Sequence, residues 1–147
     1  MRVCYLGLGA LTLLTLFVSC GGEPTGDDYL SENARREAVT TTDSGLQYEV
    51  LEEGSGPKPS LSESVTVHYK GELLDGTVFD SSYDRGEPIS FRLGQVIPGW
   101  KEGLQLMPVG SKYKFTIPSE LGYGPRGSGP IPPNSVLIFH VELLGIG

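Results

Sequence analysis

The chain has 147 residues, a formal net charge of −7 at pH 7, and many glycines (21) and prolines (11). This length favours a single domain, and the acidic balance argues against nucleic acid and against a membrane surface held by charge. The two cysteines, Cys4 and Cys20, lie near the N-terminus, which leaves the remainder of the chain without disulfide or thiol chemistry.

The first twenty residues are typical of an export signal. Arg2 supplies a positive charge, and residues 3–18 are almost wholly apolar and carry no charge. Such a run is short for a membrane span but suits a signal peptide. It ends in Leu16-Phe17-Val18-Ser19-Cys20, which resembles a bacterial lipobox, whose cysteine is lipidated and becomes the new N-terminus. We predict a lipoprotein signal peptide over residues 1–19 and lipidation of Cys20; an ordinary signal peptide, in which Cys20 has no role, is the alternative.

Residues 20–42 are predicted to form a polar tether. The stretch contains Pro24 and Gly26, although Leu30, Ala34 and Ala38 fall at helical spacing and allow a short, weak helix. As a coil, a stretch of this length spans roughly 25 Å. That length lifts a domain off a membrane without fixing its orientation.

Residues 43–147 change to a pattern of short strands. Apolar and polar residues alternate around 46–50, 65–69, 89–93 and 113–117, and Asp75-Gly76 is a hairpin turn signal. The apolar run 136–139 has no alternation, which predicts a strand buried on both faces.

One helix interrupts these strands. Trp100, Leu104 and Met107 form one apolar stripe, with Pro98 before it and Pro108 after it. A single short helix buries its stripe by packing on the concave face of a sheet. The sequence therefore predicts an α+β fold, in which one antiparallel sheet of five or six strands wraps around one short helix.

The loop at residues 118–134 is rich in glycine and proline, yet carries Leu121, Tyr123 and Ile131. Long loops with such side chains usually pack back on the domain and are often functional. Residues 122–127 match G-x-G-x-x-G, but no strand precedes them and the following prolines exclude the helix that a dinucleotide site needs.

Other catalytic classes find little support in the sequence. His68 and His140 are far apart, have no second ligand nearby and are expected on the surface, so no metal site is predicted. No G-x-S-x-G elbow is present, and Asp75 is already explained by its turn, which weakens a carboxylate pair with Asp80. Six aromatic residues remain, and from their spacing alone an ordinary core is the simpler interpretation: Tyr69, Phe79, Phe91, Trp100, Tyr123 and Phe139.

Six motifs in order resemble the FKBP-type peptidyl-prolyl isomerases, the immunophilins that bind tacrolimus. They are Val65-Thr-Val-His-Tyr69-Lys-Gly71, Asp75-Gly-Thr-Val-Phe79-Asp80-Ser-Ser82, Val96-Ile97-Pro-Gly-Trp100, Leu121-Gly-Tyr123-Gly124, Ile131-Pro-Pro133-Asn and Phe139-His-Val-Glu-Leu-Leu144. The resemblance covers residues 43–147. Residues 42–48 resemble the bacterial secreted branch, whose members often begin with a helical dimerisation arm; only the tether stands there in this chain, so we expect a monomer.

The resemblance implies a half-barrel around one helix and an aromatic pocket floored by Trp100. It implies that the catalytic residues are Tyr69, Phe79, Asp80, Tyr123 and Phe139, and that substrate contacts Phe91, Val96, Ile97, Trp100, Ile131, Ile89 and Arg85. In the family, the N–H at the Ile97 position and the Tyr123 hydroxyl bind ligand carbonyls, and Asp80 pairs with Arg85. Ile89 and Leu121 stand where eukaryotic members have aromatic residues, which bears on peptide preference and macrolide affinity.

The resemblance also implies a reaction: cis–trans isomerisation of X-Pro bonds in exported proteins, by desolvation and stabilisation of the twisted amide. No cofactor or metal is expected. Proline-containing segments, tacrolimus-like macrolides as inhibitors, and a membrane reached through the lipid on Cys20 are the expected partners, in the cell envelope at the outer membrane facing the periplasm. Two alternatives are a proline-binding module or holdase with little turnover, and a surface scaffold.

Overall fold

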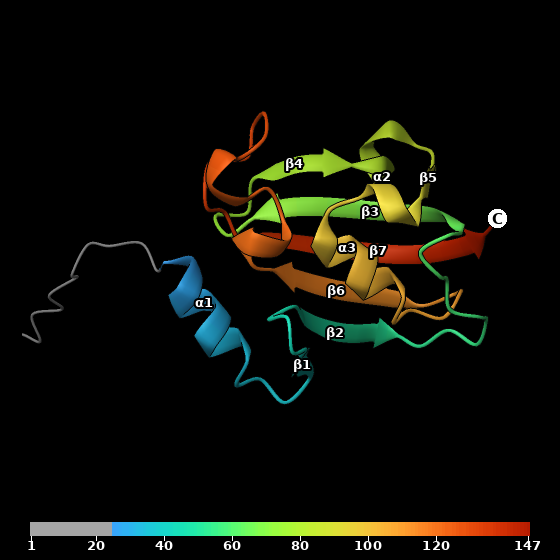
Figure 1. Ribbon diagram of the computed structural model, residues 1–147, viewed down its shortest axis with the longest axis horizontal. Helices are drawn as coiled ribbons and strands as arrows, with labels where there is room; N and C mark the ends of the chain where they lie inside the picture. Colours follow the sequence, from blue (N-terminus) through green and yellow to red (C-terminus); the bar gives the residue numbers. More distant parts are fainter. Residues whose placement is uncertain (1–24) are drawn as a thin grey trace, which may run out of the picture.

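An antiparallel sheet curves around a short helix in the computed structural model, which describes residues 25–147 (Figure 1). The strands are β1 (Val39–Thr41), β2 (Gln47–Glu52), β3 (Ser64–Leu73), β4 (Val78–Ser81), β5 (Ile89–Arg92), β6 (Lys112–Ile117) and β7 (Leu137–Ile146). The helices are α1 (Gly26–Asn33), α2 (Ser82–Arg85) and α3 (Pro98–Leu104), with single 3-10 turns at Leu93–Gln95, Ser119–Leu121 and Gly124–Arg126. The predicted α+β class is confirmed, with seven strands in place of five or six.

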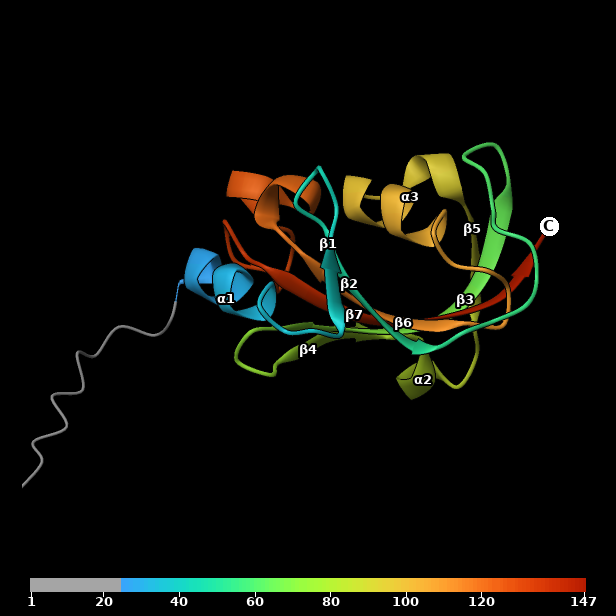
Figure 2. The ribbon, with the colours of Figure 1, turned by 90° about the horizontal axis from the view of Figure 1, so that it is seen from below.

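The long strands β3 and β7 form the centre of the sheet, whose order is β1-β2-β6-β7-β3-β4. The outer edge of β3 is shared by two short strands: β5 pairs with residues 64–67, and β4 pairs with residues 70–72. Between β4 and β5 the chain leaves the sheet and forms α2. Figure 2 shows α2 and α3 on opposite sides of the sheet.

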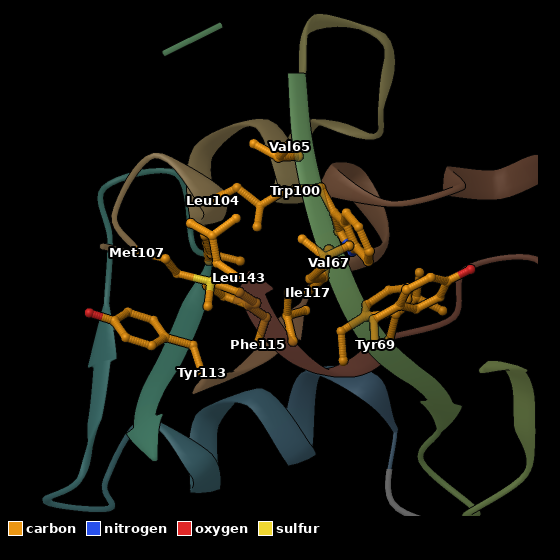
Figure 3. Close-up of a cluster of buried hydrophobic side chains, with 14 of the residues drawn as sticks. Val65, Val67, Tyr69, Trp100, Leu104, Met107, Tyr113, Phe115, Ile117 and Leu143 are labelled. Atoms are coloured by element: carbon orange, nitrogen blue, oxygen red, sulfur yellow. The ribbon is translucent and has the colours of Figure 1, made fainter. Parts of the chain in front are cut away.

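The core lies between α3 and the concave face of the sheet, as the alternating pattern predicts (Figure 3). Gly99 and Gly103 allow α3 to approach closely, because a Cβ would lie 2.7 Å from Ile117 Cγ2 at the first and 2.6 Å from Phe115 Cε1 at the second. Most buried core residues come from α3 and its C-terminal turn (Trp100, Leu104, Met107) and from β3, β6 and β7 (Val65, Val67, Tyr69, Tyr113, Phe115, Ile117, Leu137, Phe139, Val141, Leu143). The connecting segments add Leu46, Leu93 and Ile131.

The prediction of a strand buried on both faces is confirmed at residues 137–139. Leu137 and Phe139 point into the core, while Ile138 lies on the opposite face and is still only 7% exposed. At this end of the sheet the outer face also holds the buried polar residues Gln47 and Thr116, which share one row of paired residues with Ile138. A segment from the N-terminal part of the chain covers this row.

That segment is the part of the predicted tether that the structure describes, and the tether prediction is wrong for it. The weak helix expected around Leu30 forms as α1, with Thr25 and Asp28 in a capping box. Asn33 Nδ2 donates to Gln47 Oε1 at 2.7 Å, and Gln47 Nε2 donates to the Leu30 carbonyl at 2.8 Å. Buried amides that satisfy one another hold α1 on the sheet.

After α1 the chain adds β1, which pairs with β2. The ordered unit therefore begins before residue 43. The predicted signal peptide, Cys20 and the first residues of the predicted tether lie outside the described residues. Among residues 25–147, no helix is long and apolar enough to cross a membrane.

The contact of Asn33 with the sheet leads to a stability prediction. Replacing Asn33 by alanine leaves Oε1 of the buried Gln47 without its donor, so we expect Asn33→Ala to lower the free energy of unfolding by about 1–3 kcal/mol. Arg36→Ala removes a surface ion pair with Glu49 (3.1 Å) and a hydrogen bond to Asn33 Oδ1 (3.1 Å), but leaves the contact of Asn33 with Gln47 in place. We expect it to cost at most about 1 kcal/mol. Urea denaturation of both variants measures the difference. Equal stability of Asn33→Ala and wild type would mean that α1 is a free tether after all.

Candidate active site

A cavity of about 570 Å³ opens on the concave face of the sheet. It lies between α3, the strands β3, β4, β5 and β7, and the loop at residues 118–134. Its lining is mostly aromatic and aliphatic, with a few polar groups, as in typical sites for small ligands. The lining residues are Tyr69, Phe79, Asp80, Ile89, Phe91, Gln95, Val96, Ile97, Trp100, Tyr123, Ser128, Pro130, Ile131 and Phe139.

Trp100 forms the floor of the cavity and is 6% exposed. Pro98 begins α3, which places Trp100 in its first turn, facing the sheet. Tyr69 and Phe139 make T-shaped contacts with the indole, at 5.2 Å and 5.1 Å between ring centroids. Phe91 lies tilted against it at 5.3 Å. Rings from three strands therefore fix the orientation of the indole.

One wall of the cavity is the ring pair of Phe79 and Phe139, whose centroids lie 5.4 Å apart at an angle of 85°. Gly71 on β3 faces both rings. A Cβ at this position would lie 2.6 Å from Phe79 Cζ and 2.6 Å from Phe139 Cε1. The pair can close only because residue 71 has no side chain. Sequence reasoning quoted Gly71 in a motif without a role; a glycine at an inward strand position was the available signal.

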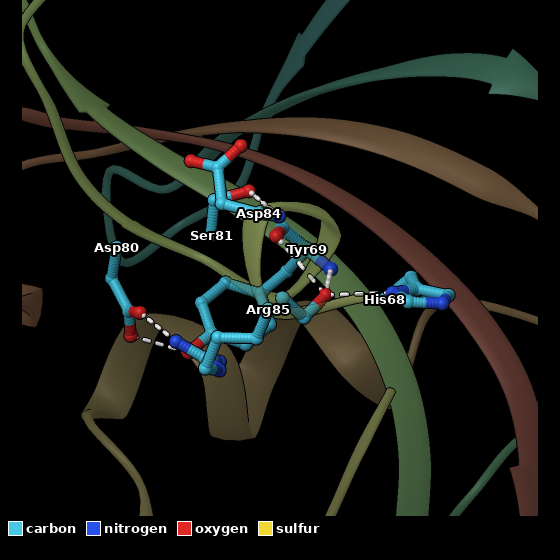
Figure 4. A network of polar contacts seen from close by, with 7 residues as sticks. His68, Tyr69, Asp80, Ser81, Asp84 and Arg85 are labelled. Carbon is cyan, nitrogen blue, oxygen red and sulfur yellow. Dashed lines mark hydrogen bonds and ion pairs between the residues drawn. The ribbon is translucent and has the colours of Figure 1, made fainter. Parts of the chain in front are cut away.

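The polar part of the cavity is a triangle of Tyr69, Asp80 and Arg85 (Figure 4). The Tyr69 hydroxyl donates to Asp80 Oδ2, Arg85 Nη1 donates to Asp80 Oδ1, and Arg85 Nη2 lies 3.1 Å from the Tyr69 oxygen. Burial and the carboxylate of Asp80 raise the pKa of Tyr69. Burial acts to raise the pKa of Asp80 too, but the hydrogen bonds from Tyr69 and Arg85 outweigh it and lower that pKa. At neutral pH the triangle therefore holds a neutral phenol, an anion and a cation.

The loop at residues 118–134 forms the rim, as expected of a long loop that carries Tyr123 and Ile131. Ile131 is 6% exposed and packs into the core, while Tyr123 is 38% exposed. Two backbone hydrogen bonds join Ser128 and Ile131 (3.0 and 2.8 Å), and the N–H of Asn134 donates to the Gly124 carbonyl at 2.9 Å. The loop therefore has its own internal structure and holds Ile131 against the cavity.

The structure brings together the residues that the sequence assigned to a pocket. All of them line the cavity except Arg85, which contacts it through Asp80 and Tyr69; their roles in binding and catalysis stay predictions. Sequence reasoning missed Gln95, Ser128 and Pro130. Gln95 directly precedes Val96, and the other two lie in the loop already suspected of function.

The two histidines lie outside the cavity. His140 Nε2 is 3.5 Å from Glu72 Oε1, and the ring of His68 stacks on Tyr83 at 4.7 Å. His68 is half-buried, so it is more enclosed than the surface residue that we expected. Among residues 25–147, no three histidine, cysteine, aspartate or glutamate side chains are grouped so that they could hold a metal ion.

Comparison with known protein families gives two matches. Residues 56–144 match the family described as FKBP-type peptidyl-prolyl cis-trans isomerase. Residues 23–50 match a family described as the domain amino-terminal to FKBP-type peptidyl-prolyl isomerase. The second match contains α1 and β1, which lie within the predicted tether, and part of β2, which the alternating pattern had predicted.

Curated relatives are similar over most of this chain. The "FKBP-type peptidyl-prolyl cis-trans isomerase FkpA" of Aeromonas hydrophila is 61% identical over 82% of this chain and 45% of its own length. The "Outer membrane protein MIP" of Legionella longbeachae is 49% identical over 82% of this chain and 52% of its own. The chain thus spans about half the length of these curated relatives.

A solved structure shows the same arrangement. The crystal structure of a peptidyl-prolyl cis-trans isomerase from Pseudomonas syringae superposes with a TM-score of 0.78 at 36% identity. The alignment covers 83% of this chain and 90% of that one. The fold and the sequence motifs therefore agree.

The triangle also leads to a prediction about pH. The pKa of Asp80 is lower in the folded state than in the unfolded chain, so its ionised form stabilises the fold above the unfolded value, and this contribution disappears as the pH falls through the folded value. We expect the difference in unfolding free energy between wild type and Asp80→Asn to stay constant from about pH 7 to about pH 5 and to shrink below about pH 4. Urea denaturation at a series of pH values measures this difference.

Asp84→Asn is the matched control, because Asp84 is an exposed carboxylate of the same turn that lies outside the triangle. It removes the same charge without touching Tyr69 or Arg85. A difference between wild type and Asp80→Asn that grows on acidification would contradict the assignment.

Proposed function

Because the chain belongs to the FKBP-type peptidyl-prolyl cis-trans isomerase family, we propose that its cavity binds proline-containing segments and accelerates rotation about the X-Pro bond. The observation that carries the proposal is the cavity itself: four aromatic rings from α3, β3, β5 and β7 converge beside the triangle of Tyr69, Asp80 and Arg85. The apolar surface suits a proline ring, and the polar groups suit its backbone.

The reaction makes and breaks no covalent bond. The barrier of ~18–20 kcal/mol arises from the loss of C–N conjugation when the amide twists, and an X-Pro bond turns over in tens to hundreds of seconds without catalysis. The planar amide is more polar than the twisted amide. A dry pocket around Trp100 and Phe139 therefore favours the twisted form relative to water.

Polar groups around the cavity supply the orientation. Among residues 25–147, the N–H of Ile97 donates no hydrogen bond, and it lies at the start of α3 beside Trp100. We assign this N–H to a carbonyl of the bound peptide, with Tyr123 as a second donor at the rim. Tyr69 keeps its proton and Asp80 its charge at neutral pH, because burial and Asp80 raise the pKa of Tyr69 while the bonds from Tyr69 and Arg85 lower that of Asp80.

The size of the effect sets a requirement for this mechanism. A ~10⁶-fold acceleration requires that the pocket bind the twisted amide about 8 kcal/mol more tightly than the planar one. Binding the planar and the twisted amide equally tightly would contribute nothing to this difference in binding free energy. It would give the alternative function, a holdase that binds proline segments with little turnover.

The activity prediction separates these two functions. We expect the protein to accelerate cis-to-trans conversion of an Ala-Leu-Pro-Phe peptide and tacrolimus to inhibit it. Phe79→Ala opens the wall next to Phe139, so kcat/KM falls by about 10- to 100-fold, a loss of about 1.4–2.7 kcal/mol of transition-state stabilisation. Val78→Ala is the matched control, because Val78 precedes Phe79 on the same strand and is 41% exposed.

The results of this assay distinguish an isomerase from a holdase. A folded wild type that binds the peptide but gives no acceleration at micromolar concentration overturns the isomerase and favours the holdase. Equal losses for Phe79→Ala and Val78→Ala would assign the effect to the strand and not to the cavity. Neither a cofactor nor a metal enters the proposed mechanism, and we propose a monomer as the active form.

We further propose that the protein acts in the cell envelope, attached to the outer membrane through a lipid on Cys20 and facing the periplasm. The relative from Legionella carries the name "Outer membrane protein MIP". The sequence before residue 20 has the pattern of a lipoprotein signal peptide. Exported proteins with X-Pro bonds are the proposed substrates, since proline isomerisation limits the folding of many chains.

Fractionation of cells tests the anchor. Cys20→Ser removes the thiol that accepts the lipid, so we expect the variant to move from the membrane fraction to the soluble envelope fraction. Cys4→Ser, within the predicted signal peptide, is the matched control and leaves the mature protein in the membrane fraction. A Cys20→Ser protein that remained with the membrane would refute lipidation.

A further inference from the structure

The outer edge of β3 has a gap in its pairing next to the candidate active site. β5 pairs with residues 64–67 and β4 with residues 70–72, so neither reaches Tyr69. Tyr69 is 5% exposed, and a buried backbone amide without a partner is costly. Ser82 fills the gap: its Oγ accepts from the Tyr69 N–H at 2.7 Å and donates to the Tyr69 carbonyl at 3.2 Å. One hydroxyl thus replaces a missing strand partner.

Ser82 is also the first residue of α2, and Arg85 is the last. The same short turn therefore holds Tyr69 at two places. Ser82 binds its backbone, while Arg85 reaches its hydroxyl and Asp80 (Figure 4). Since α2 has only four residues, a shift of its start on β3 also shifts the Arg85 guanidinium relative to Tyr69 and Asp80.

A side chain on the outer face of the sheet also contacts the Ser82 hydroxyl. His68 Nδ1 lies 2.8 Å from Ser82 Oγ. The ring nitrogen is thus a third hydrogen-bond partner of the Ser82 hydroxyl, beside the N–H and the carbonyl of Tyr69. The His68 ring stacks on Tyr83 of α2, and the Tyr83 hydroxyl lies 3.3 Å from Glu142. The start of α2 is therefore held by the backbone at the edge of β3 and by side chains on the outer face of the sheet.

We propose that Ser82 is a positioning residue of the active site, whose hydroxyl sets the α2 turn on β3 so that Arg85 lies across Tyr69 and Asp80. The kinetic consequence rests on the proposed isomerase function. The geometric consequence does not, because the contact of Arg85 with Asp80 exists without substrate. Ser82 does not line the cavity and acts through the α2 turn that carries Arg85.

The first experiment measures the placement of Arg85 directly. A ¹³C NMR titration of the Asp80 carboxyl reports its hydrogen bonds from Tyr69 and Arg85. We expect the midpoint to move upward in Ser82→Ala and in Arg85→Ala, since both remove the guanidinium from the carboxylate. Ser111→Ala is the matched control: Ser111 is equally inaccessible, and its hydroxyl donates to the Pro108 carbonyl, outside the cavity. An unchanged Asp80 midpoint in folded Ser82→Ala overturns the proposal.

The second experiment is a double-mutant cycle on the isomerisation of a proline peptide. We expect Ser82→Ala to lower kcat/KM about 10-fold in the wild-type background and less than about 2-fold in the Arg85→Ala background, because residues in one network do not act additively. Ser111→Ala should lower stability without changing kcat/KM. Equal losses from Ser82→Ala in both backgrounds would exclude action through Arg85.

An inactive wild type and an unfolded Ser82→Ala variant are two results that leave the role of Ser82 testable. If wild type shows no isomerase activity, the proposed function fails while the Asp80 titration still decides the role of Ser82. If Ser82→Ala does not fold, Ser82→Cys fills the same site with a weak hydrogen-bonding group and should show the same upward shift of the Asp80 midpoint. A Ser82→Cys protein with the wild-type midpoint would then overturn the proposal.

Discussion

The packing of α3 on the concave face through Trp100 is the contact on which the rest of the structure depends. Gly99 and Gly103 bring the helix close to Ile117 and Phe115 on β6. The indole of Trp100 belongs to this core and also forms the floor of the cavity. Because the same ring serves both purposes, the cavity has a rigid base whose orientation is set by the burial of core residues and not by a mobile loop.

The polar groups of the cavity depend on the edge of that same sheet. Tyr69 belongs to the core through its ring and to the triangle through its hydroxyl. Its neighbours Asp80 and Arg85 come from β4 and α2, where the chain leaves β3 and returns as β5. An irregularity in strand pairing thus places one compensated charge pair beside an apolar pocket, where an isolated charge would be costly.

The N-terminal part shows how far a small domain extends beyond its catalytic motifs. α1 and β1 add a helix and an edge strand to the sheet, and the buried amides of Asn33 and Gln47 join them to β6 through Thr116. The helix covers the outer face at the row of Ile138, which explains why residues 137–139 of β7 are apolar on both faces. The domain match at residues 23–50 falls on these elements.

The fold class, most strands, α3 and most of the residues around the cavity could be predicted from the sequence. Alternation separates Tyr113, Phe115 and Ile117 from their outward neighbours, and periodicity places Trp100 with Leu104, because these patterns follow directly from backbone geometry. Residue spacing alone did not separate a pocket from a core; the ordered motifs did.

Contacts between residues far apart in the chain could not be predicted, because they exist only in the folded molecule. No local pattern shows that Asn33 meets Gln47, that Gly71 admits two phenylalanine rings, or that Ser82 replaces a strand partner of Tyr69. Each of these contacts depends on which buried groups still lack a hydrogen-bond or packing partner once the strands have paired. That is a property of the assembled sheet and of no single segment.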